Sequence, residues 1–111
     1  MGDCIEFLSG GYYKATIHRV VQPPPDQQGY PRVGVFYFAI PDDDVRLIPV
    51  QGSPVLDKYG IQRRIEDSKA PTAEIMRKGR VSTYGKVELE RGPEAFSEVQ
   101  YVAGIMVRHY N

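Results

Sequence analysis

His18 and Arg32 are the two residues of this sequence whose side chains and spacing suggest chemistry. His18 lies in the segment KATIHRVV (residues 14–21), where polar and apolar side chains alternate as in a strand. Arg32 opens the next strand-like segment, and the loop between them would bring both residues to the same end of a strand pair. A neutral imidazole is a common metal ligand, and a guanidinium fork suits a carboxylate. The alternative, from spacing alone, is a core histidine beside a surface arginine.

Short strands followed by one helix are expected to position these two side chains. Strands are predicted at residues 4–8, 12–21, 32–40, 45–50 and 99–110, with an extended piece at 53–56 and a helix at about 72–85. The proline-rich run at 22–31 is predicted to be a loop, because proline fixes φ and lacks an N–H group. Strands that precede a helix in this way favour a mainly β or an α+β domain.

The composition limits the classes of function. A chain of 111 residues is one domain at most. Its 14 Lys and Arg residues balance its 14 Asp and Glu residues, so no net field favours nucleic acid or anionic lipid. No apolar run approaches the roughly 20 residues that span a membrane, and the N-terminal residues do not resemble a secretion signal. The single cysteine fits a reducing compartment, and we therefore expect a cytoplasmic protein.

Residues 2–41 carry a more specific pattern. It consists, in order, of Gly2–Asp3, a Gly10–Gly11 turn, His18–Arg19–Val20 and Arg32. This pattern resembles the C-terminal half of the core of Fe(II)- and 2-oxoglutarate-dependent dioxygenases, in the isopenicillin N synthase-like branch common in fungal secondary metabolism. The tail, residues 71–111, is similar to the C-terminal helix and closing His-Tyr-Asn of that group. The resemblance implies a partial double-stranded β-helix (jelly-roll) core half at residues 1–50. Residues 51–111 would be a C-terminal extension with the helix and a final strand.

The same resemblance implies roles for the two residues. His18 would be the distal histidine of an iron-binding triad of two histidines and one carboxylate. Arg32 would bind the far carboxylate of 2-oxoglutarate. Fe(II) and 2-oxoglutarate would thus be the cofactor and co-substrate of an oxidoreductase that acts on a small molecule.

The sequence departs from the family pattern in two places. Gly34 stands where the family has a serine that also bonds the co-substrate, which removes one hydrogen bond worth about 1 kcal/mol. No His-x-Asp motif precedes His18, so the chain supplies one iron ligand of three. We therefore expect a fragment of such a dioxygenase that is inactive by itself.

Two further readings stay open. His109 could rebuild a triad with Asp42, Asp43 or Asp44, but those carboxylates are expected at the far end of the strand that Arg32 opens. A solvated acidic turn and a packed histidine are the plainer interpretation. In the other reading, the chain is a small non-catalytic β protein, whose unpaired strand edges bind a partner or drive self-association.

Overall fold

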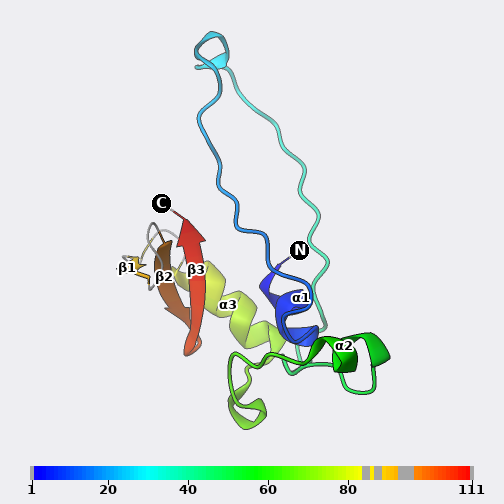
Figure 1. Cartoon of the computed structure of the whole chain (residues 1–111). Helices are drawn as coiled ribbons and strands as arrows, with labels where there is room; N and C mark the ends of the chain where they lie inside the picture. Colours follow the sequence, from blue (N-terminus) through cyan, green and yellow to red (C-terminus); the bar gives the residue numbers. More distant parts are fainter. Residues whose placement is uncertain (1, 84–85, 87–88, 93–96, 111) are drawn as a thin grey trace.

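The computed structural model of the chain describes residues 2–83, 86, 89–92 and 97–110. The elements are α1 (Asp3–Leu8), the 3-10 turn η1 (Pro25–Gln27), α2 (Pro54–Tyr59), the 3-10 turn η2 (Asp67–Lys69), α3 (Ala73–Thr83), β1 (Glu90–Arg91), β2 (Ser97–Val102) and β3 (Ile105–Tyr110). The helices and the sheet gather at one end, and the chain between α1 and α2 runs out as a long loop (Figure 1). The molecule is therefore elongated, with extents of 52 × 30 × 26 Å.

The C-terminal part is a small antiparallel sheet packed beside α3. Its strand order is β1-β2-β3, and β2 and β3 form a hairpin in which Val102 pairs with Ile105. The two residues of the turn, Ala103 and Gly104, have φ values of 51° and 77°. Two successive positive φ angles match the right-handed twist of a tight hairpin, which explains this short connection.

The core lies where α1 and α3 meet the hairpin. Its buried side chains are Phe7, Leu47, Ala73, Met76, Val102, Ile105 and Val107. Helix α3 passes so close to β2 that a Cβ added at Gly79 would lie 2.7 Å from Cγ1 of Val102. The segment before α3 is fixed to the helix start by backbone bonds from Leu47 N to Pro71 O and from Ala73 N to Val45 O, of 2.9 and 2.8 Å. These contacts build one body from both halves of the sequence.

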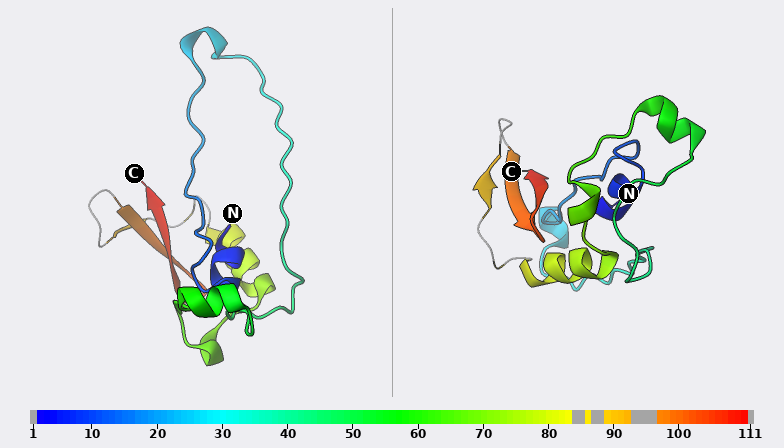
Figure 2. Two further views of the ribbon diagram at one scale, coloured as in Figure 1. Left: turned by 45° about the vertical axis from the view of Figure 1, so that its right-hand side comes forward. Right: turned by 90° about the horizontal axis from the view of Figure 1, so that it is seen from below.

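Two arms extend from this body and meet at η1 (Figures 1 and 2). We call residues 14–24 the first arm and residues 28–42 the second arm. Neither arm contains a regular element, and within the described residues no backbone hydrogen bond joins one arm to the other. Their large apolar side chains are exposed: Val20, Val21, Tyr30, Val33, Val35, Phe36, Tyr37, Phe38 and Ile40.

The helix predicted at about 72–85 is confirmed as α3, whereas three other predictions are wrong. Residues 4–8 belong to helix α1 and not to a strand. The piece predicted as extended at 53–56 begins helix α2, because Ser53 Oγ accepts a bond from Leu56 N and Pro54 suits the first helical turn. The final strand predicted at 99–110 is two strands, because the Ala103–Gly104 turn divides it.

The strands predicted at 12–21, 32–40 and 45–50 are also wrong for this chain. The first two lie in the region of the arms, and the third contributes only an isolated bridge between Arg46 and Thr72. The sequences of the first two suit strands, but a strand requires a neighbour, and among the described residues no backbone hydrogen bond joins these two segments to each other. What the structure shows is a small three-stranded antiparallel sheet with a few helices.

Candidate functional site

His18 lies on the exposed first arm. Its Nδ1 is 2.9 Å from the carbonyl oxygen of Thr16. Because a carbonyl oxygen only accepts, Nδ1 is the donor in this bond, and the neutral ring then keeps the lone pair of Nε2. In this tautomer His18 therefore presents the lone pair of Nε2, the atom that would bind a metal ion.

Arg32 lies on the second arm and is likewise exposed. Within the described part of the chain it has no ion-pair partner. The sequence predicted that a strand pair would bring His18 and Arg32 to one end. The arms that carry them are unpaired, so the structure builds no common site from these two side chains.

The described residues do not fit an iron ion. They contain no group of three His, Cys, Asp or Glu side chains that could hold a metal. The alternative ligand His109 has a side chain outside the described part of the chain. Of its suggested partners, Asp43 accepts two hydrogen bonds of 2.9 Å from Nη2 of Arg77. Among the described residues, His18 therefore belongs to no group of three such side chains.

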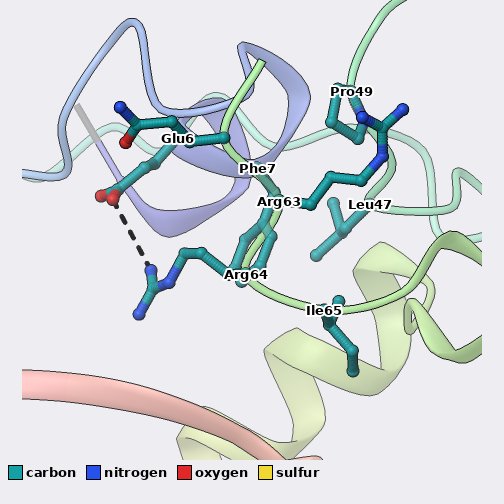
Figure 3. A pocket seen from close by; sticks show the side chains of 8 residues that line it. Glu6, Phe7, Leu47, Pro49, Arg63, Arg64 and Ile65 are labelled. Carbon is teal, nitrogen blue, oxygen red and sulfur yellow. Dashed lines mark ion pairs between the residues drawn. The ribbon is translucent and has the colours of Figure 1, made fainter. Parts of the chain in front are cut away.

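A small cavity lies where α1 meets the chain before η2 (Figure 3). Its lining residues include Glu6, Phe7, Leu47 and Arg64, and its volume is about 10 Å³. That volume holds about one water molecule, so the cavity is too small for a substrate.

A larger hollow of about 370 Å³ opens at the base of the first arm. Its lining residues are Asp3, Glu6, Gly11, Lys14, Ala15, Ile17, Gln62 and Arg64, and neither His18 nor Arg32 is among them. Both of its acids already have partners. Asp3 pairs with Arg80 at 3.0 Å, and Glu6 accepts a bond of 2.7 Å from Ala15 N. The acids of the hollow are therefore already paired, and Lys14 is its one lining charge without an ion-pair partner among the described residues.

Sequence reasoning missed Arg64, which joins three parts of the body. Its guanidinium lies 3.7 Å from a carboxylate oxygen of Glu6, bonds the carbonyl oxygen of Met106 and lies over the ring of Phe7. These partners are far from Arg64 in the sequence, and no local pattern signals contacts of that range.

Cys4 lies beside the core, half-buried on α1. Burial, with the negative charge of Asp3 as a smaller cause, raises the pKa of the Cys4 thiol. A raised pKa keeps the thiol protonated and a poor nucleophile.

Among the described residues, the most exposed large apolar side chains lie on the second arm. Val33, Val35 and Tyr37 are 91%, 95% and 91% exposed, and the two phenylalanines between and after them are more than three-quarters exposed. Contiguous apolar surface of this kind marks an interaction site in soluble proteins.

Comparisons with known proteins leave the family open: no family model, no curated protein and no solved structure matches the chain. In the part of the chain that the structure describes, no helix has both the length and the apolar character to cross a membrane.

Proposed function

We propose that the chain is the C-terminal part of the core of an Fe(II)- and 2-oxoglutarate-dependent dioxygenase that acts on a small molecule. The supporting observation is the state of the arms. They carry strand-like sequences, yet their large apolar side chains are exposed, and among the described residues no backbone hydrogen bond joins one arm to the other. Strand sequences without neighbours fit a jelly-roll half whose remaining strands come from upstream polypeptide.

In this proposal His18 contributes one iron ligand through Nε2, and Arg32 binds the far carboxylate of 2-oxoglutarate. The second histidine and the carboxylate would come from a His-x-Asp motif in the upstream part. Because the described residues do not fit iron, no reaction step is assigned to this chain by itself. We expect it to retain no Fe(II) and to consume no 2-oxoglutarate when it is isolated.

The test begins with the native transcript upstream of the Met1 codon. An in-frame extension encoding His-x-Asp supports the proposal, and the joined protein should then consume 2-oxoglutarate with Fe(II). In the joined protein His18→Ala should abolish this activity. Arg19→Ala is the matched control, because Arg19 is the neighbouring residue on the opposite strand face and should retain it. Stop codons in every upstream frame would contradict the proposal.

A second candidate function is favoured by the exposed second arm. Here the chain is a non-catalytic protein that associates with another chain through its unpaired strand edges. The supporting observation is the continuous apolar surface from Val33 to Ile40, which water would otherwise cover. Two measurements on the isolated chain distinguish this function from the first. The chain should form an oligomer of defined size, and it should unfold in one cooperative transition.

A further inference from the structure

We infer that residues 32–42 of the second arm pair with the same residues of a second copy of this chain. The pairing is an antiparallel two-stranded ribbon with Tyr37 on its two-fold axis. The inference rests on the second candidate function and names its partner, direction and register.

The first argument is the charge at the two ends of the segment. Arg32 stands at one end and Asp42 at the other, and no charged residue lies between them. Neither has an ion-pair partner among the described residues. An antiparallel partner of the same sequence puts Arg32 opposite Asp42 at both ends, whereas a parallel partner puts like charges together. The segment is therefore complementary to an inverted copy of itself.

The second argument fixes the register. The chain turns directly after Asp42, because Val45 N bonds the carbonyl oxygen of Asp42 at 3.0 Å. The turn sets the C-terminal end of the segment at Asp42, and pairing Asp42 with Arg32 of the other copy puts Tyr37 at the midpoint. In this register Pro41 of one copy faces Val33 of the other. Proline has no N–H group, so this pair fits only at a position where the two strands exchange no hydrogen bonds. Tyr37 is four residues from Pro41, and such pairs alternate along the strand. The two copies of Tyr37 therefore also face each other without exchanging hydrogen bonds.

The third argument is the surface that the pairing would cover. Phe36 of each copy faces Phe38 of the other on one side of the ribbon, and Gly34 faces Ile40. The ring of Phe36 already lies over Gly34, where an added Cβ would be 3.0 Å from a ring carbon. Cross-strand pairs of apolar and aromatic side chains on one face of a ribbon each contribute roughly 0.2–1 kcal/mol.

The register is tested by disulfide trapping in a Cys4→Ser background. Tyr37→Cys should crosslink two copies on mild oxidation, because residues facing each other without hydrogen bonds have Cα atoms about 4.5 Å apart. Val35→Cys is the matched control, since it is equally exposed and on the same strand face. In this register it faces Ala39, so two such cysteines lie roughly 13 Å apart and should not crosslink.

The charge argument is tested by sedimentation of reversal variants of the full chain. Arg32→Asp and Asp42→Arg should each weaken the dimer roughly 5- to 30-fold, because each breaks two exposed ion pairs. The double variant re-forms both pairs with inverted signs and should return to within roughly 3-fold of the native affinity.

The outcomes separate the inference from the candidate function on which it rests. A dimer that crosslinks through Val35→Cys, or that the double reversal does not restore, overturns this register and leaves self-association standing. A chain that is monomeric at every accessible concentration overturns both. Crosslinking through Tyr37→Cys alone, with rescue by the double reversal, supports both.

Discussion

Among single residues, Arg64 connects helix α1 to strand β3. Its guanidinium contacts Glu6 and the ring of Phe7 in α1 on one side, and the carbonyl oxygen of Met106 in β3 on the other. About a quarter of its side chain is exposed, so solvent screens these contacts only in part. A planar fork holds five donors in fixed directions and can stack on a ring, whereas a lysine ammonium offers three donors from a single point.

We therefore expect Arg64→Lys to lower the free energy of unfolding by about 1 kcal/mol and Arg64→Met by about 2 kcal/mol. The measurement is the urea midpoint at unchanged slope. Arg63→Lys is the control, because Arg63 makes only an exposed pair with Asp67 and should change stability by less than about 0.5 kcal/mol. Equal losses at both positions would contradict the role of Arg64.

The predictions made from the sequence for single residues compare differently with the structure. Cys4 is half-buried beside the core, on a helix where a strand was predicted. The roles of His18 and Arg32 stay predictions, because they come from a family pattern and depend on residues outside this chain. Arg64 could not be predicted, since side chains that are distant in sequence define its surroundings.

At the scale of elements, the packing of α3 on β2 depends on the absence of a side chain at Gly79. Alanine is the better helix former by about 1 kcal/mol. Here, however, the added Cβ would press on Val102, whose side chain is 1% exposed and stiff about its first torsion.

We expect Gly79→Ala to destabilise the native protein by about 1–3 kcal/mol despite the gain in helix propensity. The matched background is Val102→Ala, where the clash is gone. There the same Gly79→Ala change should stabilise by up to about 1 kcal/mol. Thermal unfolding of the four proteins measures both values, and the absence of a sign change between backgrounds would contradict the close approach.

Element prediction succeeded where local signals suffice. The proline and threonine before α3 and its early acid Glu74 are all within one turn of the helix start, so this helix was predictable. The run at 4–8 was too short to tell a strand from a helix by periodicity. The hairpin turn was missed because Ala103–Gly104 lacks the usual Asn-Gly signal. The arms have a strand pattern but no neighbour, and the sequence of one segment does not reveal its partner.

At the scale of the whole molecule, the body and the arms differ in how their backbones are held. The body has a shared core from α1 to β3, whereas the second arm is exposed over its whole apolar length. Proteases require an extended backbone that can enter their active sites, so cleavage is expected where the chain has no element.

At concentrations where the chain is monomeric, brief digestion with chymotrypsin should cut first in the second arm, after Phe36, Tyr37 or Phe38. Tyr101 serves as an internal control, because its side chain is exposed but its backbone is paired in β2. Since Phe7 is buried in the shared core, the two pieces should elute together under native conditions. Mass spectrometry identifies the cut, and early cleavage after Tyr101 would contradict the paired hairpin.

The order of charges along the second arm also makes it an electric dipole. Arg32 lies toward η1, and the three acids Asp42, Asp43 and Asp44 lie where the arm rejoins the body. The chain has no net charge, so two approaching molecules feel little overall repulsion. Their arm dipoles are lowest in energy side by side and antiparallel, an orientation that favours productive encounters before any contact forms. Dissolved salt would weaken this orienting force beyond about 10 Å and so slow encounter more than it loosens a formed contact.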